Sequence, residues 1–301
     1  MNGIKHIIKL SGLLLVIFAF SACDQGETID FGSSILPRRQ MRESAALARK
    51  VELTVESRSS DGRDVHYSYY FEEAQERMPF RVCAPRAWNG SDPLPLVMFL
   101  HGAWNNENSY VDQNEGQLKR LADEHGFLLV SPLGAHGAYG NNILLPAEFG
   151  REKEAADILS NLTPEKDAAN ALSEKDVINV LEIVLRHYPV RQDRMFLCGH
   201  SMGGGGTWTI GGKYASYWRA IAPMSGPFVL EQGYPWQNLK KIPVYITEGT
   251  QATASLQASR KLYAFLSERG FDVSYDEYDA DHGGMVPVSL PDVFRFFEQH
   301  I

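Results

Sequence analysis

The hydrophobic pattern in the second half of the chain alternates between two periods. Short continuous apolar runs predict buried strands, whereas apolar residues recurring every three or four positions predict amphipathic helices. The predicted strands are residues 94–100, 127–130, 195–198, 220–224, 242–247 and 273–278. The predicted helices are residues 115–125, 173–187, 202–213, 254–269 and 290–300. Because strands and helices alternate, we expect an α/β fold with a doubly wound, mostly parallel sheet.

The chain before residue 94 has a different pattern. Residues 38–50 are predicted to form a short helix. Residues 51–58 and 65–71 alternate between apolar and polar side chains, and a Ser-Asp-Gly turn lies between them. A third strand is predicted at residues 79–85. These segments predict antiparallel strands at the beginning of the sheet.

A long connection follows the predicted strand at residues 127–130. Residues 133–172 are the least strand-like part of the chain, and we interpret them as an insertion that covers the functional site. A helix is predicted around residues 147–159, and Ser173 is the predicted N-cap of the helix that follows. Four apolar residues of the insertion have two possible roles, which are contact with the substrate and ordinary packing of the insertion. These residues are Tyr139, Leu144, Leu145 and Phe149.

The N-terminus has the features of a targeting segment. Basic residues precede an apolar run from Leu10 to Phe20, which is too short to span a bilayer. The sequence Phe20-Ser-Ala-Cys23 resembles a bacterial lipobox. We therefore expect a signal peptide at residues 1–22, lipidation of Cys23, a tether over residues 23–37, and one domain over residues 38–301. The alternative is ordinary secretion with cleavage near Ala22; in either case the expected location is the bacterial periplasm or cell envelope.

Composition narrows the function classes. The chain has 301 residues, of which 44% are hydrophobic, and these values suit one large α/β domain. The net charge of −8 argues against nucleic acid as a partner, and membrane contact is expected only through the N-terminal lipid. Cys198 is predicted to be buried, although a bridge to Cys83 is conceivable in an exported protein. The histidines at positions 125, 136 and 187 lack ligand spacing, so we expect no metal and no cofactor.

The strongest chemical motif is Gly199-His-Ser201-Met202-Gly203. It follows the predicted strand at residues 195–198 and precedes a predicted helix, which is the context of a G-x-S-x-G nucleophile elbow. A tight turn there would expose the hydroxyl of Ser201 and direct the N–H of Met202 toward a developing oxyanion. The alternative is a glycine-rich turn with an incidental serine.

A candidate general base lies downstream of the serine. His282 follows the last predicted strand, in a loop that contains Gly283 and Gly284. Such a loop leaves the imidazole accessible to a serine at the neighbouring strand ends. The alternative is a surface histidine beside Asp279 and Asp281.

With the serine motif and the downstream histidine, the chain resembles the α/β-hydrolase superfamily. More narrowly, it resembles exported esterases of the polyhydroxybutyrate depolymerase, feruloyl esterase and predicted prolyl-oligopeptidase-like peptidase branch, and residues 194–226 carry the most specific part of the resemblance. The resemblance implies that Ser201 is the nucleophile of an acyl-enzyme mechanism and that His282 is its general base and acid. It also implies oxyanion donors at Met202 and at Ala103 or Trp104, after the His-Gly that ends the strand at residues 94–100. His101 itself is interpreted as a structural histidine.

The sequence departs from the family pattern at the third catalytic residue. The family places an Asp after the strand that corresponds to residues 242–247, where this chain has Ala252. Glu248 at the strand tip is the favoured substitute, from a displaced position. The other hypotheses are Glu231, after the preceding strand, and a Ser–His dyad or degenerate site. Asp279 and Asp281, which both precede His282, are too close to it in sequence to be favoured.

These features predict an exported serine hydrolase that cleaves a carboxylic ester from a small molecule or a polymer. Two alternatives share the scaffold: a serine peptidase, and a lipoprotein that binds a ligand without cleaving it. The absence of the expected Asp keeps the second alternative open.

Overall fold

The computed structural model describes residues 36–140, 149–151, 153, 163–229 and 234–301. The predicted signal peptide, the lipid attachment at Cys23 and nearly all of the tether lie outside these residues. Within the described ranges, no helix has both the length and the hydropathy that crossing a bilayer would require.

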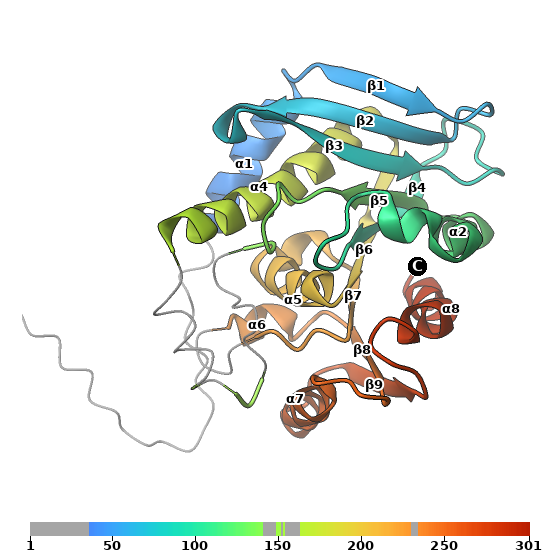
Figure 1. Cartoon of the computed structure of the whole chain (residues 1–301). Helices are drawn as coiled ribbons and strands as arrows, with labels where there is room; N and C mark the ends of the chain where they lie inside the picture. Colours follow the sequence, from blue (N-terminus) through green and yellow to red (C-terminus); the bar gives the residue numbers. More distant parts are fainter. Residues whose placement is uncertain (1–35, 141–148, 152, 154–162, 230–233) are drawn as a thin grey trace, which may run out of the picture.

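The described strands form one sheet in the order β1-β2-β3-β5-β4-β6-β7-β8-β9 (Figure 1). Their bounds are β1 Leu53–Arg58, β2 Asp64–Phe71, β3 Glu76–Cys83, β4 Leu94–Leu100, β5 Leu128–Pro132, β6 Val190–His200, β7 Ala220–Met224, β8 Val244–Gly249 and β9 Val273–Tyr278. Neighbours from β1 through β5 in this order pair antiparallel. The remaining neighbours are all parallel. The predicted fold class, including its antiparallel beginning, is confirmed.

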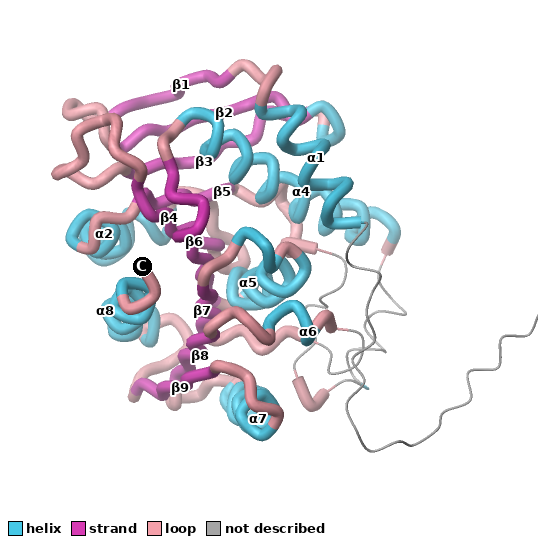
Figure 2. The backbone as a smooth tube through the Cα atoms, turned by 180° about the vertical axis from the view of Figure 1, so that it is seen from behind, coloured by secondary structure: helices cyan, strands magenta, loops and turns pink. Residues whose placement is uncertain are grey.

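Helices cover both faces of the sheet (Figure 2). Helices α2 (Ser109–Glu124) and α8 (Met285–Glu298) lie on one face. The helices on the other face are α1 (Leu36–Ala48), α4 (Pro164–His187), α5 (Met202–Lys213), α6 (Trp236–Leu239) and α7 (Leu256–Glu268). The arrangement places a hydrophobic core on each side of the sheet.

Strand β4 shows why the predicted central strands are apolar throughout. Leu96, Met98 and Leu100 belong to the core under α4 and α5, whereas Val97 and Phe99 belong to the core under α2 and α8. Successive side chains of a strand point to opposite faces, so a strand between two helical layers needs apolar residues at every position.

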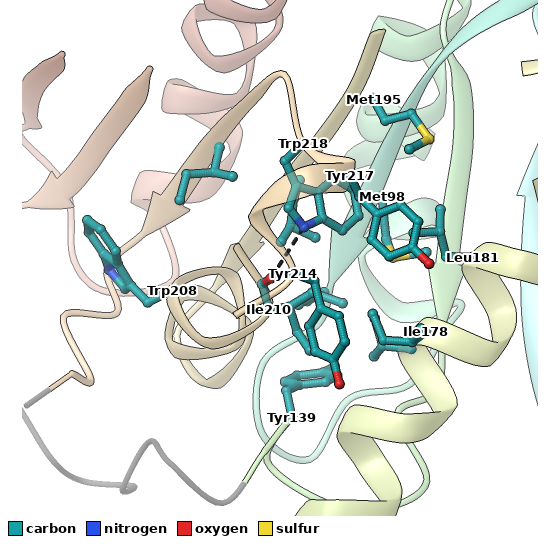
Figure 3. Close-up of a cluster of buried hydrophobic side chains, with 14 of the residues drawn as sticks. Met98, Tyr139, Ile178, Leu181, Met195, Trp208, Ile210, Tyr214, Tyr217 and Trp218 are labelled. Carbon is teal, nitrogen blue, oxygen red and sulfur yellow. Dashed lines mark hydrogen bonds between the residues drawn. The ribbon is translucent and has the colours of Figure 1, made fainter. Parts of the chain in front are cut away.

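Large aromatic side chains fix α5 against the sheet (Figure 3). Trp218 is buried and its indole N–H donates to the carbonyl of Ile210 at 3.3 Å. Tyr214 is also buried, and its hydroxyl donates to Glu174 of α4 at 2.6 Å. The packing of these rings holds α5, and with it the β6–α5 turn, against the sheet. Their buried polar atoms are hydrogen-bonded, so this packing leaves neither ring with an unpaired donor.

Helix α4 begins at Pro164, well before the predicted start at Ser173. Thr163 is its N-cap, and the threonine hydroxyl accepts the N–H of Lys166 at 3.4 Å. Ser173 is buried inside the helix, where its hydroxyl accepts the N–H of Tyr139 at 3.0 Å. The N-cap prediction was wrong because a proline is well accepted in the first turn of a helix, so the helix-forming residues before Ser173 extend α4.

The last helix also begins earlier than predicted. Helix α8 starts at Met285 and not at residue 290, because Pro287 falls in the first turn, where a missing N–H costs no hydrogen bond. The loop that carries His282 is therefore short and lies between the end of β9 and the start of α8.

A buried carboxyl group holds the described part of the predicted insertion. Asp176 of α4 accepts the N–H of Gly134 at 2.9 Å and the hydroxyl of Tyr69 at 2.6 Å. Burial raises the pKa of Asp176 to about 6, and the hydrogen bonds from Tyr69 and the loop amides oppose this rise. The loop after β5 is thereby tied to α4.

The proposed substrate contacts of the insertion belong to the core where they are described. Tyr139 is fully buried, and its hydroxyl donates to the carbonyl of His101 at 3.2 Å. Phe149 is buried and its ring packs against Phe265 at a centroid distance of 5.2 Å. Ordinary packing is therefore the correct interpretation for both residues. Leu144, Leu145 and most of the helix predicted at residues 147–159 lie outside the described residues.

Candidate active site

Ser201 occupies a sharp turn between β6 and α5. Its backbone is left-handed, with φ 59° and ψ −117°, and its N–H donates to the carbonyl of Met224 at 3.0 Å. A non-glycine residue in such a conformation is strained, and the surrounding strands hold it there. The side chain is partly exposed, so its hydroxyl is accessible at the ends of the parallel strands.

Two glycines of the motif are required by space. A Cβ atom on Gly199 would lie 2.4 Å from the carbonyl oxygen of Gly203, and one on Gly203 would lie 2.0 Å from that of Leu100. Both neighbours are backbone atoms and cannot rotate away. The spacing G-x-S-x-G therefore follows from the close approach of α5 to β6 and β4.

His282 lies beside Ser201, as the sequence predicted. Its Nε2 is 2.9 Å from the hydroxyl oxygen of Ser201. The turn that carries it is closed by Asp281, whose carboxylate accepts the N–H of Gly284 at 2.6 Å. Within this geometry the imidazole can accept the hydroxyl proton of Ser201 when the serine attacks an electrophile.

Glu248 lies at the end of β8, but Ser225 stands between it and His282. The Oγ of Ser225 is 2.8 Å from Nδ1 of His282 and donates to Oε1 of Glu248 at 2.5 Å. Glu248 is fully buried. The favoured residue is thus behind the histidine, and its link to the histidine is indirect.

Among the described residues, neither of the two aspartates that precede His282 has a hydrogen bond to its ring. The Asp279 carboxylate accepts the side-chain amide of Gln251 at 2.7 Å, and Asp281 closes its own turn. Glu231 lies outside the described residues. Ala252, which stands where the family pattern has Asp, has a left-handed backbone with φ 52°.

A second histidine supports the loop of His282. Nε2 of His200 lies 2.7 Å from the carbonyl oxygen of His282, and its Nδ1 lies 2.7 Å from the hydroxyl of Tyr110. Because a carbonyl only accepts, Nε2 of His200 carries the proton and the tyrosine hydroxyl donates to Nδ1. Burial lowers the pKa of His200 to about 3, so this residue stays neutral and keeps its tautomer.

The loop after β4, where the oxyanion donors Ala103 or Trp104 are predicted, begins near Ser201. A Cβ atom on Gly102 would lie 3.5 Å from Cβ of Ser201, so the loop begins beside the serine. No hydrogen bond among the described residues engages the N–H of Ala103 or Trp104. Met202 is the first residue of α5, and the first N–H groups of a helix lack partners within the helix. These amides are free to bind an oxyanion.

His101 has a structural place, in agreement with its interpretation from the sequence. It is buried, and its two ring nitrogens lie 2.8 Å and 2.7 Å from the carbonyl oxygens of Gly102 and Leu133. It thereby ties the loop after β4 to the loop after β5.

Sequence reasoning missed Ser225, His200 and Tyr110. Ser225 had a usable signal, because it directly follows the predicted strand at residues 220–224, and the carboxyl ends of parallel strands gather functional side chains. His200 lies inside the G-x-S-x-G motif, at a position that the motif leaves free. Tyr110 had no local signal. Across the described residues, no group of three or more His, Cys, Asp or Glu side chains is placed to hold a metal ion.

A model of the Esterase family, whose description is "Putative esterase", matches residues 72–284. The matched range contains Ser201, Ser225, Glu248 and His282. No curated protein gives a significant match to the sequence.

Solved structures share the fold at low sequence identity. Fluorophosphonate-binding serine hydrolase F of Staphylococcus aureus, with substrate bound, is 17% identical and has a TM-score of 0.59, over 78% of this chain and 98% of its own. A ferulic acid esterase is 14% identical, with a TM-score of 0.61 over 79% of this chain and 98% of its own. The ferulic acid esterase of Anaeromyces mucronatus, in complex with ferulic acid, is 18% identical with a TM-score of 0.56, over 79% and 90%. These likenesses show a common fold.

Proposed function

Since the chain belongs to the esterase family, we propose that it hydrolyses carboxylic esters of small molecules or polymers through an acyl-enzyme on Ser201. The observation that carries this proposal is the 2.9 Å separation between the Ser201 hydroxyl and Nε2 of His282, at a strained turn where the hydroxyl is accessible. A serine hydroxyl is a weak nucleophile unless a base takes its proton, and His282 is within reach to do so.

The proposed reaction has two halves. Oγ of Ser201 attacks the ester carbonyl carbon while Nε2 of His282 accepts the hydroxyl proton, and the carbonyl oxygen becomes an oxyanion. The N–H of Met202, with that of Ala103 or Trp104, stabilises this oxyanion. The carbon–oxygen bond to the leaving alcohol then breaks, and His282 returns the proton to that oxygen. In the second half, water attacks the acyl carbon while Nε2 of His282 accepts a proton from the water. The bond between that carbon and Oγ of Ser201 then breaks, His282 returns the proton to Oγ, and the acid is released.

A substrate panel tests the proposal. We expect the purified protein to hydrolyse at least one of the acetyl, feruloyl and hydroxybutyrate esters, and to leave a peptide p-nitroanilide intact under the same conditions. Hydrolysis of the anilide alone would identify a peptidase and contradict the ester proposal. Tight binding of an ester without any turnover would identify a non-catalytic ligand-binding protein and would contradict it as well.

Substitution of Trp104 tests which substrates of the panel the site prefers. Its side chain is fully exposed on the loop after β4, and its backbone is left-handed with φ 60°, which is uncommon for a bulky residue. An exposed indole two residues after Gly102, on the loop that begins beside Ser201, offers a stacking surface for a ring in the substrate. Trp104→Ala keeps the backbone N–H, so we expect kcat for a ring-bearing ester to stay near the wild-type value while KM rises about 3- to 10-fold.

A matched control for this prediction is Tyr70→Ala, because Tyr70 is an exposed aromatic residue on β2, away from the serine. The control should leave both constants unchanged. An unchanged KM in the Trp104 variant would show that its side chain does not contact the substrate.

A further inference from the structure

A serine hydroxyl occupies the place beside His282 where a serine hydrolase has its carboxylate. Ser225 follows β7 directly and is fully buried, with a left-handed backbone of φ 45°. Its N–H donates to the carbonyl of Thr247 on β8 at 2.8 Å, so both neighbouring strands fix its position. Backbone strain of this kind persists only where the surroundings impose it.

Glu248 is surrounded by donors. Its Oε1 accepts the Ser225 hydroxyl and the N–H of Gly249 at 3.1 Å. Its Oε2 accepts the hydroxyls of Ser255 at 3.0 Å and Ser259 at 2.6 Å. A carboxylate can accept all four hydrogen bonds at once. None of the ion pairs among the described residues includes Glu248, so these hydrogen bonds are what compensates its burial.

The hydrogen positions follow from this arrangement. A serine hydroxyl has one proton, and the Ser225 proton points to Glu248. Its lone pairs then face Nδ1 of His282, which must supply the proton of the 2.8 Å contact. With Nδ1 protonated, Nε2 of the neutral ring is the acceptor that faces Ser201. The serine therefore selects the same tautomer that a directly bound carboxylate would select.

We propose that Ser225 is a positioning residue, which orients His282 and transmits to it the charge of Glu248. The inference rests on the proposed function, since it assigns His282 as the base. The functional chain then has four members in series: Ser201, His282, Ser225 and Glu248. When His282 takes the proton of Ser201, the imidazolium forms one hydroxyl group away from a buried carboxylate, at a separation where the attraction between the charges is still substantial.

A purely structural role for Ser225 predicts something different. In that case the hydroxyl only satisfies Glu248, and removing it should cost stability without a special effect on turnover. Ser259 is the matched control, because Ser259 is buried and donates to the same carboxylate at 2.6 Å, whereas the ring of His282 is hydrogen-bonded to Ser201 and Ser225. Ser259→Ala removes one donor from Glu248 and leaves the link to His282 intact.

The experiment measures kcat and KM for the best ester, together with thermal unfolding, for Ser225→Ala, Ser225→Gly, Glu248→Gln and Ser259→Ala. The glycine variant is included because glycine adopts a left-handed backbone without strain, so it folds even where the alanine variant does not. We expect both Ser225 variants and Glu248→Gln to lower kcat about 10²- to 10³-fold with little change in KM. This loss is smaller than the roughly 10⁴-fold effect of neutralising a directly bound acid. Ser259→Ala should stay within about threefold of the wild type.

Two further readouts separate a link in series from two independent residues. The double variant Ser225→Ala/Glu248→Gln should be no slower than the slower single variant, within about threefold, because each change breaks the same chain. The acidic limb of the kcat/KM profile should move to lower pH by about half a unit in Glu248→Gln, since the imidazolium loses a nearby negative charge. It should stay in place in Ser259→Ala.

Three results would overturn the inference: a Ser225 variant with the kcat of Ser259→Ala, single effects that multiply in the double variant, or an acidic limb that stays in place in Glu248→Gln. A failure of the proposed function looks different, because the wild type itself would then be inactive toward every ester and unreactive toward a fluorophosphonate. Active wild type with fully active Ser225 variants contradicts only the role of Ser225.

Discussion

Ser201→Ala is expected to lower kcat for the preferred ester by about 10⁵- to 10⁶-fold, to the limit of detection. The variant removes the only atom of this residue that can form the acyl bond, and the base and the oxyanion donors cannot replace it. Alanine leaves the backbone of the turn unchanged, and a partly exposed hydroxyl contributes little to folding. Steady-state kinetics on freshly purified protein, with thermal unfolding to verify the fold, provide the measurement.

Ser91→Ala is a suitable control for this experiment. Its hydroxyl is exposed and has a local hydrogen bond to Asn89 at 3.2 Å in a surface loop, so the variant removes a serine hydroxyl away from the elbow. It should keep the full activity. Residual turnover of more than about one hundredth in Ser201→Ala, with wild-type behaviour in the control, would place the nucleophile elsewhere.

Gly203→Ala is expected to have the largest effect on folding. The added Cβ would lie 2.0 Å from the carbonyl oxygen of Leu100 and 2.5 Å from its carbonyl carbon. Both are backbone atoms of a central strand, so relief requires that α5 and β4 move apart. We expect a loss of more than about 3 kcal/mol in the free energy of unfolding, measured by urea denaturation, or insoluble protein.

Gly283→Ala tests whether any added methyl group near the site would do the same. The nearest atom to its new Cβ is Oδ1 of Asp281 at 4.0 Å, and this glycine does not have a left-handed backbone. It should unfold at the urea concentration of the wild type. If Gly203→Ala also unfolds there, then the close contact between α5 and β4 is absent and the elbow geometry is incorrect.

The sequence was informative where one segment determines its own structure. The apolar run of β4 predicted a strand buried on both faces, and the structure places its alternate residues in two separate cores. The G-x-S-x-G spacing predicted the turn at Ser201 because contacts among backbone atoms of that motif and β4 require both glycines. The predicted start of α4 was wrong, because the residues after Thr163 are helical although the pattern assigned them to an insertion.

The third part of the candidate site depends on strands that are distant in sequence, and there the pattern was insufficient. Glu248 was selected from its place at the strand tip, and the structure puts it behind His282. Its connection through Ser225 required the ends of β7 and β8 to lie side by side with the loop after β9. No periodicity or motif in the sequence shows whether the residue at the end of β7 or the one at the end of β8 contacts His282 directly. The lipid attachment at Cys23 stays a prediction from the sequence.

Intact-protein mass spectrometry after incubation with a fluorophosphonate tests the central claim, a nucleophilic Ser201, most directly. We predict that the wild type gains the mass of one phosphonyl group and that the modification maps to Ser201, while Ser201→Ala gains none. A folded wild type that gains no mass, or a modification on any other residue, would contradict the proposed acyl-enzyme mechanism.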